Sequence, residues 1–161
     1  MNDVAEHASV GRATLYRHFP TRDDLLAAIK AQARQEAVAA VENCPLDEGS
    51  AIDCIERIVR AMIELGDRYR FISSWRADAQ EDREPSERIA AALKTAVERG
   101  QRRGEITRSV PADWAVRAIR SLLLAVIEQL AEGTISEREA ERLATRVVFH
   151  GLAPASREKT Q

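Results

Sequence analysis

The segment of residues 4–25 constrains the fold more strongly than any other part of the chain, because it holds two short helical patterns separated by a turn. Val4, Ala5 and Ala8 lie one, three and four positions apart, a spacing that predicts one apolar face of a short helix. Residues 9–11 read Ser-Val-Gly, and such turn-forming residues predict that the first helix ends there.

The second helical pattern follows at once. Leu15 and Phe19 are four residues apart, which places both on one face of a helix. Pro20 ends that helix, because the residue before a proline avoids the α region. Thr21 then predicts the N-cap of a following helix, with Asp24 three positions on as its capping-box partner. A short helix, a tight turn, a second short helix and a firm stop together form a helix-turn-helix pattern.

Charge points to the same segment. Between residues 9 and 22 the chain has three arginines, Arg12, Arg17 and Arg22, and no acidic residue, whereas the whole chain carries 24 basic and 26 acidic residues and a net charge of −2. A basic patch on a mildly acidic protein is typical of a localised contact with nucleic acid. The alternative interpretation is an ordinary solvated helix face.

Residues 14–20 read Thr-Leu-Tyr-Arg-His-Phe-Pro and are followed by Arg22 and Leu25; this run resembles the signature of TetR-family transcriptional regulators. In that family the run spans the recognition helix, here at about residues 11–19, and enters the next helix. The resemblance implies an all-α protein in which a helix-turn-helix is joined by a long helix to a helical ligand-binding and dimerisation domain. It also implies a homodimeric, ligand-responsive repressor of double-stranded operator DNA.

The resemblance implies a role for each residue of the motif. The residues expected to contact DNA phosphates are Thr14, Tyr16, His18 and Arg22. Arg12 and Arg17 occupy positions that face base edges, where arginine can bond guanine through two hydrogen bonds.

Three features depart from the family pattern. Gly11 stands where the family often has a capping serine, and Ser9 stands where it often has glycine, so we expect a less rigid turn. The family also places one more helix before the one at Val4, whereas this sequence begins at Met1. Three explanations are open: a native start upstream, an incomplete chain, or loss of the helix. The last case favours an alternative function, a dimeric helical module that binds a small molecule or a protein without binding DNA.

The rest of the chain predicts helices throughout, since it has only seven glycines and five prolines. We expect residues 1–43 to form the DNA-binding part and linking helix, residues 44–152 the regulatory and dimerisation domain, and residues 153–161 a disordered tail. Ser136 and Glu139 predict a second capping box. The helices expected after the motif cover residues 21–43, 50–67, 69–80, 86–103, 111–132 and 136–151.

Two sets of residues are candidates for the regulatory functions that the resemblance implies. Large apolar side chains on the helices that surround the family's effector pocket are candidates for binding an unidentified small organic effector, or else simply fill the core: Met62, Phe71, Trp75, Leu93 and Trp114. The last two helices carry a face of small and weakly polar residues and an apolar stripe, which allow close helix approach. The resemblance implies that they form the dimer interface, and the alternative is packing within the chain alone: Ala118, Ser121, Leu122, Ala125, Gln129, Leu143 and Val147.

Other functions are disfavoured. His7, His18 and His150 share no metal-ligand spacing, and neither a glycine-rich phosphate loop nor a nucleophile elbow is present, so we expect no enzyme, no metal and no cofactor. The longest apolar run of the C-terminal half, Leu122 to Ile127, is far shorter than the roughly 20 residues of a membrane-spanning helix. Without an apolar leader after Met1, we expect a cytoplasmic protein that does not contact membranes.

The two cysteines, Cys44 and Cys54, do not suggest a disulfide framework. We expect two reduced structural thiols. A redox switch between them is conceivable, because only a short loop separates them, although no residue near them in the sequence is expected to activate either thiol.

Overall fold

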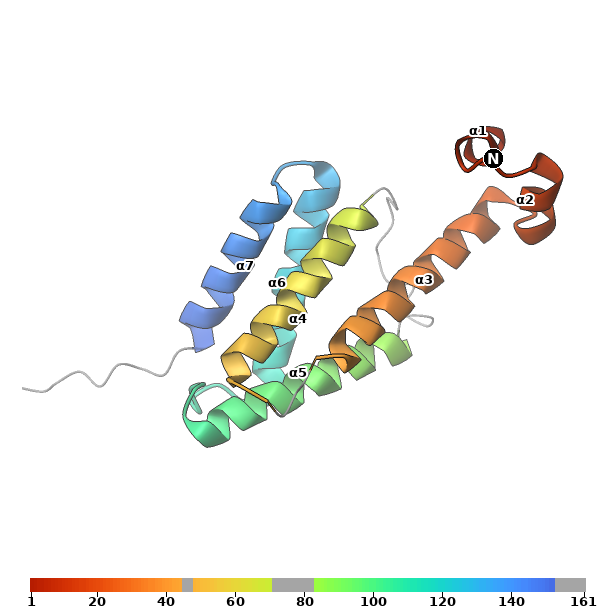
Figure 1. Ribbon diagram of the computed structural model, residues 1–161. Coiled ribbons are helices and arrows are strands. Elements are labelled where there is room, and N and C mark those ends of the chain that lie inside the picture. Colours follow the sequence, from red (N-terminus) through yellow and green to blue (C-terminus); the bar gives the residue numbers. More distant parts are fainter. Residues whose placement is uncertain (45–47, 71–82, 153–161) are drawn as a thin grey trace, which may run out of the picture.

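The computed structural model describes residues 1–44, 48–70 and 83–152, and within these residues the chain forms seven α-helices and no strand (Figure 1). The all-α prediction is therefore confirmed. The helices are α1 (Asn2–His7), α2 (Arg12–His18), α3 (Arg22–Glu42), α4 (Ala51–Arg68), α5 (Arg83–Arg103), α6 (Ala112–Glu132) and α7 (Glu137–Leu152).

Helix boundaries agree with the predicted signals at most points. The Thr21 side chain accepts the amide of Asp24 at 3.1 Å, and the Asp24 carboxylate accepts the amide of Thr21 at 2.9 Å, which completes the capping box at the start of α3. At the start of α7 the amide of Ser136 donates to the carboxylate of Glu139, and the amide of Glu139 donates to the hydroxyl of Ser136, which forms the second predicted capping box. Gly133 ends α6 in the left-handed conformation, with φ 71°, as a glycine after a helix commonly does.

The predicted start of α5 is wrong. The sequence predicts that this helix begins at Ser86, but α5 already begins at Arg83 and includes Pro85. A proline fits in the first turn of a helix, because its missing N–H would have no partner there. Residues 71–82, which hold most of the helix expected at 69–80, and the tail expected at 153–161 lie outside the described residues.

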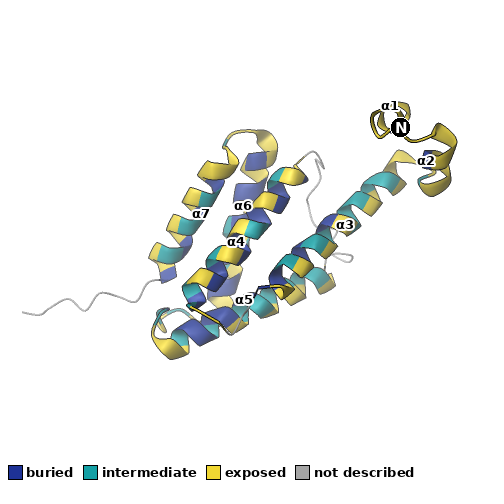
Figure 2. Cartoon of the chain, in the orientation of Figure 1, coloured by how far each residue is buried: buried dark blue, intermediate teal, exposed yellow. Residues whose placement is uncertain are grey.

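Helices α4 to α7 and the C-terminal half of α3 form one bundle, and the α1–α2 unit lies at the far end of α3 (Figure 1). The buried residues of α3 show where the bundle ends, since all of them lie between Ala33 and Val41 (Figure 2). The N-terminal half of α3 therefore extends beyond the bundle and carries α1 and α2 with it.

Helix α4 lies at the centre of the bundle and packs on α3, α5, α6 and α7. Its inner face buries Ile55, Ile58 and Ile63 almost completely. Gly100 lets the start of α4 approach α5 closely, because a Cβ at that position would lie 2.9 Å from the Cβ of Ala51. That Cβ would also lie 2.7 Å from the side chain of Ile106, so a larger residue at position 100 would fit only if its neighbours shifted.

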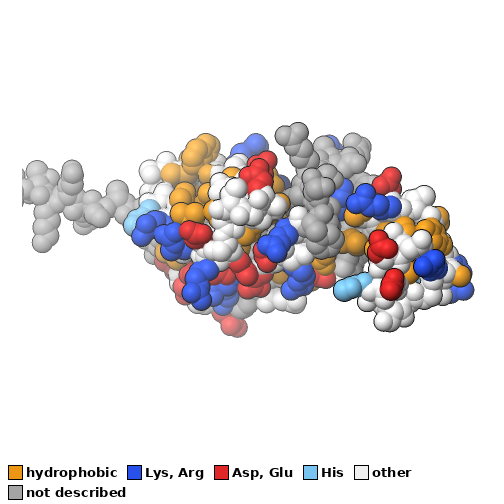
Figure 3. Space-filling model, turned by 90° about the horizontal axis from the view of Figure 1, so that it is seen from above, with side chains coloured by type: hydrophobic (Ala, Val, Ile, Leu, Met, Phe, Trp, Pro, Cys, Tyr) orange, Lys and Arg blue, Asp and Glu red, His pale blue; other side chains and the backbone are white. Residues whose placement is uncertain are grey.

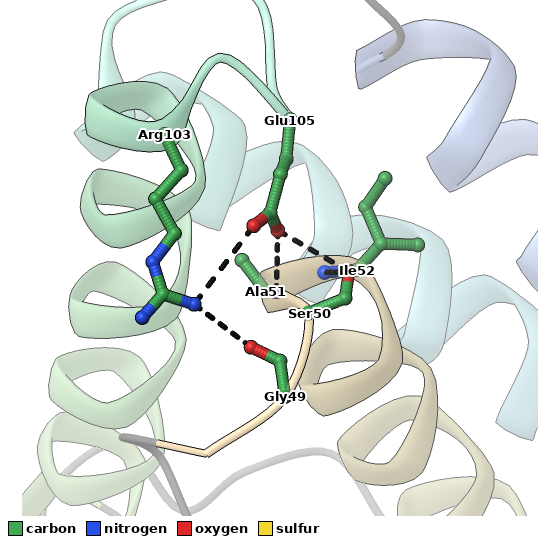
Figure 4. A network of polar contacts seen from close by, with 6 residues as sticks. All are labelled: Gly49, Ser50, Ala51, Ile52, Arg103 and Glu105. Atoms are coloured by element: carbon green, nitrogen blue, oxygen red, sulfur yellow. Dashed lines mark hydrogen bonds and ion pairs between the residues drawn. The ribbon is translucent and has the colours of Figure 1, made fainter.

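A carboxylate holds the N-terminus of α4 in place (Figure 4). The side chain of Glu105, from the connection after α5, accepts the amide of Ala51 at 2.6 Å and the hydroxyl of Ser50 at 3.2 Å. Arg103 donates to the carbonyl of Gly49 at 2.9 Å. A negative charge at a helix N-terminus is favoured by the helix dipole, so this contact fixes α4 against the end of α5.

Candidate nucleic-acid interface

The turn between α1 and α2 begins with two backbone hydrogen bonds at the C-terminal end of α1. The amide of Ser9 donates to Glu6 at 3.1 Å and the amide of Val10 donates to Ala5 at 2.9 Å, which together form a Schellman motif. This geometry requires a left-handed residue, and Ser9 adopts it with φ 54°. The departure from glycine noted in the sequence therefore leaves Ser9 in a conformation that costs free energy.

Helix α2 is short and has one inward side chain. Gly11 is its N-cap and makes no side-chain cap bond, as expected for a residue without a hydroxyl. Leu15 is the buried residue of α2, and the helix ends at His18, before Phe19 and Pro20. The remaining surface of α2 faces outward.

All six predicted DNA-contacting residues are exposed. Arg17 lies roughly 200° around the helix from Leu15, so it projects from the outermost part of α2. Thr14 and His18 lie to one side of Arg17, and Tyr16 lies to the other side. Arg12 lies at the N-terminal end of α2, roughly 60° around the helix from Leu15, and Arg22 is the first residue of α3.

The positive charge of this surface is not neutralised within the described part of the chain. None of the ion pairs between described residues includes Arg12, Arg17 or Arg22. The surface therefore presents three guanidinium groups whose charges are available to a polyanion such as DNA.

The α1–α2 unit depends on α3 for its position. Helix α1 packs on α2, and among the described helices neither of them packs on the bundle of α4 to α7. The unit continues into α3 through Pro20 and Thr21. A rotation of α3 against the bundle would therefore move the exposed face of α2.

Polar contacts join α3 to the bundle. The carboxylate of Glu36 accepts hydrogen bonds from Arg68 at 2.9 Å, from the Tyr69 hydroxyl at 3.0 Å and from Gln32 at 3.0 Å. The hydrogen bonds from Gln32 and Tyr69, with the charge of Arg68, lower the pKa of Glu36. Further along α3, Glu42 forms an ion pair with an α5 residue, Arg88. These contacts join α3 to α5 and to the C-terminal end of α4.

Similar proteins support the same interpretation of the N-terminal segment. The family model of bacterial regulatory proteins of the tetR family matches residues 1–29. The HTH-type transcriptional repressor LfrR of Mycolicibacterium smegmatis is 27% identical over 133 residues, which are 83% of this chain and 70% of that protein. The chain therefore resembles TetR-family transcriptional regulators, and its N-terminal segment is similar to the DNA-binding part of that family.

Solved structures of TetR-family proteins share the fold of the whole described chain. The regulator PfmR from Thermus thermophilus superposes with a TM-score of 0.73 at 21% identity, over 96% of this chain and 88% of PfmR. LfrR from Mycobacterium smegmatis, in complex with proflavine, superposes with a TM-score of 0.66 at 24% identity, over 93% of this chain and 83% of LfrR. The likeness covers the α1–α2 unit and the bundle together.

Three of the five effector-pocket candidates lie among the described residues, and they differ in burial. Met62 and Leu93 are buried in the core, whereas Trp114 exposes 62% of its surface near the start of α6. The pocket role predicted for Trp114 does not fit this placement, because Ala115 and Val116 take the inward positions of that turn. The remaining candidates, Phe71 and Trp75, lie outside the described residues.

The structure does contain an open hollow, of about 310 Å³, on the outer face of α4. Its lining is mostly charged, whereas sites for organic ligands are mostly apolar. The hollow therefore differs from the effector pocket that the sequence predicts. Its lining residues are Asp53, Glu56, Arg57, Arg60, Ala61 and Glu64.

The dimer-interface candidates lie on the outer surface of α6 and α7. Hydrophobic side chains gather on the exposed surface at this end of the molecule, opposite the α1–α2 unit (Figure 3). Leu143 and Val147 are exposed on α7, and Trp114 and Leu124 are exposed on α6. The α6 candidates are half-buried at Ala118 and Leu122 and exposed at Ser121, Ala125 and Gln129.

No pattern in the sequence indicated the two sets of contacts that join distant parts of the chain. Glu36 and its partner Arg68 are 32 positions apart, and no spacing rule connects residues so distant in the chain. Glu105 was missed for the same reason, although an acid after a helix-ending glycine was a weak signal. Within the described residues no group of three metal-ligating side chains occurs, and each helix is too short or too polar to cross a lipid bilayer.

Proposed function

We propose that this protein is a homodimeric, ligand-responsive repressor of the TetR type that binds double-stranded operator DNA through α2. The observation that carries the proposal is the exposure of Arg17 opposite the buried Leu15, on a basic helix at the outer end of α3. Such a regulator acts in the cytoplasm, where bacterial operator DNA lies.

In the proposed complex, the position of each side chain around α2 suggests its role. Arg17 is at the centre of the outward face, so it enters the major groove and bonds a base edge. Arg12 does the same from the N-terminal end of the helix, which is the end that commonly contacts bases. The polar side chains that flank Arg17, together with Arg22, bond phosphates and hold α2 in register: Thr14, Tyr16 and His18.

A mobility-shift titration with DNA from upstream of the protein's own gene tests DNA binding. We expect a discrete shifted band that weakens as salt rises, because basic side chains displace counterions from the phosphates. Arg60→Ala, which removes an exposed arginine of α4 far from α2, is the matched control and should leave the band unchanged. A shift that is equally strong with a scrambled duplex would reject sequence-specific binding.

The dimer is proposed to form through α6 and α7, since exposed apolar residues gather there (Figure 3). Ala125→Glu would place a charge on each copy near the two-fold axis, where the two charges repel each other. Sedimentation should then show a dimer for the parent and a monomer for the variant. Ala91→Glu, at an exposed position of α5, should remain a dimer, and a parent that sediments as a monomer at high concentration rejects the model.

The effector is proposed to be a small organic molecule that acts on DNA binding through α3. Proflavine, present in the LfrR structure, is a suitable first probe. A ligand changes DNA affinity only by favouring one arrangement of α3 over another, and linkage requires DNA to change ligand affinity by the same factor. Tryptophan fluorescence titrations with and without operator test this, and a scrambled duplex controls for proflavine binding to DNA itself. Equal proflavine affinity under all conditions would show that it is not an effector.

A second candidate is the same helical protein without DNA binding. It is favoured by the α1–α2 unit, in which Val4 and Val10 are exposed and few side chains are buried. Small units with little buried surface are marginally stable. Loss of the shifted band with a folded, dimeric protein would support this candidate over the first.

A further inference from the structure

The two cysteines of the chain meet at the joint between α3 and α4. Cys44 lies two residues after the end of α3, where its amide donates to the carbonyl of Val41 at 3.1 Å, and Cys54 is the fourth residue of α4. Their sulfur atoms are 3.7 Å apart, and both thiols are reduced. Cys44 exposes 8% of its surface and Cys54 none. Since the chain has only these two cysteines, each is the other's only possible intramolecular disulfide partner.

We propose that Cys44 and Cys54 form a redox modification site that a small hydroperoxide converts into an intramolecular disulfide. The bridge would join the C-terminal end of α3 to the start of α4. The proposal concerns the joint between the two helices, and it does not depend on whether the protein binds DNA.

Two arginines act by charge on the region around the two thiols. Arg57 interacts with both sulfur atoms, and charge interaction with Cys44 is the largest cause of the raised pKa of Arg57. The positive charge of Arg99, which is almost fully buried, also acts on Cys54.

The two thiols are not equivalent. Burial is the main cause that raises the pKa of Cys54 to about 11, so Cys54 remains protonated. Cys44 is closer to solvent, and its partner Arg57 also lines the open hollow on α4. Cys44 is therefore the residue that meets the oxidant first, and Cys54 is the residue that resolves the product.

The reaction is a two-electron oxidation. The Cys44 thiolate attacks one oxygen of the hydroperoxide, the O–O bond breaks, and an alcohol or water leaves with one proton. The Cys44 sulfenic acid that results is attacked by the Cys54 sulfur, the S–O bond breaks, and the Cys54 proton leaves with the hydroxide as water. Two thiols and one hydroperoxide thus yield one disulfide, one alcohol or water, and one water.

Only a small movement of the two sulfur atoms is needed to form the disulfide. The sulfur atoms must approach from 3.7 Å to roughly 2.05 Å, the length of a disulfide. Cys44 lies after the end of its helix, so its side chain can turn without breaking helical hydrogen bonds of α3. Once formed, the bridge would fix the end of α3 beside Glu42, which already pairs with Arg88 of α5.

Peptide mass mapping after treatment of the full-length protein with hydrogen peroxide tests the site. Trypsin releases residues 35–57 as one peptide that holds both cysteines and no methionine. We expect this peptide to lose two hydrogen atoms and to recover them with dithiothreitol. Cleavage after Glu48 should leave the two halves joined until reduction. Oxygen addition to both cysteines without hydrogen loss, or disulfide-linked dimers alone, would overturn the proposal.

Single variants assign the order of the two thiols. Cys54→Ser should accumulate one oxygen on Cys44, whereas Cys44→Ser should react much more slowly, since Cys54 is fully buried. The parent protein should melt at a higher temperature when oxidised, and dithiothreitol should reverse the shift. A disulfide that forms without any change in melting temperature would contradict the claim that the bridge fixes the joint.

Discussion

The α1–α2 unit and the helical bundle use their side chains in opposite ways. In α1 and α2 the buried residues are Ala5 and Leu15, and almost every other side chain points to solvent. In the bundle, α4 alone buries nine residues, and its neighbours close around it (Figure 2). The comparison teaches that the bundle supplies the stability of the chain, whereas the α1–α2 unit supplies a binding surface.

The difference also explains why α3 is important. Hydrophobic stabilisation grows with the apolar area removed from water, and the α1–α2 unit removes little. Helix α3 belongs to both regions, because its first half carries the unit and its second half is part of the core. The predictions below test whether the two regions are as unequal, and as dependent on α3, as this comparison suggests.

The largest expected difference is in stability. Leu93→Ala empties a fully buried position of the bundle core and should lower the free energy of unfolding by about 2–5 kcal/mol. The matched Leu15→Ala, in α2, should leave the main unfolding transition nearly unchanged, because that unit can open locally. Urea denaturation followed by circular dichroism measures both. Equal losses would show that the two regions unfold as one unit.

The next prediction separates two roles within the binding surface. Arg17→Ala should weaken operator binding by about 1–3 kcal/mol and relax the preference at one base position. Arg22→Ala should weaken binding to all sequences alike and flatten the salt dependence, because a phosphate contact carries no sequence information. Fluorescence anisotropy on a set of single-base operator variants distinguishes them. The same loss of specificity from both changes would reject this division of roles.

A smaller effect is expected from the turn after α1. Left-handed backbone costs a residue with a side chain about 1–2 kcal/mol, and Ser9 adopts it with φ 54°. Ser9→Gly removes that strain at some cost in the entropy of the unfolded chain, so we expect slower amide hydrogen exchange in α1 and unchanged exchange in α4. Ser86→Gly, inside α5, should instead make amide hydrogen exchange faster in α5. Faster exchange in α1 of Ser9→Gly would contradict the assignment of strain.

The smallest effect is expected from the contacts of Glu36, which join α3 to the end of α4. Because its hydrogen bonds lower the pKa of Glu36 below 4.5 in the folded protein, Glu36 stabilises the fold above pH 4.5, and this contribution is lost as the pH falls through the lowered pKa. Glu36→Gln should remove this acid sensitivity, while Glu64→Gln, on the exposed side of α4, should keep it. Melting temperatures across an acid series measure the difference, and parallel curves for the parent and Glu36→Gln would refute the role of this carboxylate.

The sequence alone was sufficient for the local structure. The capping boxes at Thr21 and Ser136, the stop at Pro20 and the left-handed Gly133 all act through residues within a few positions of one another. For the same reason the helix-turn-helix could be predicted from a short run of residues, together with the outward face of α2. The strain at Ser9 follows from the same local rules.

Only the tertiary structure decided which distant side chains meet. Trp114 is large and apolar, as pocket residues often are, but its position around α6 leaves it exposed. The periodicity of a sequence does not say which face of a helix another helix will cover. The contact of Glu36 with Arg68, the cap that Glu105 places on α4 and the 3.7 Å between Cys44 and Cys54 likewise depend on how helices pack. Local spacing determines where a helix begins and which residues share a face, whereas partners far apart in the chain are set by the cooperative packing of the whole core.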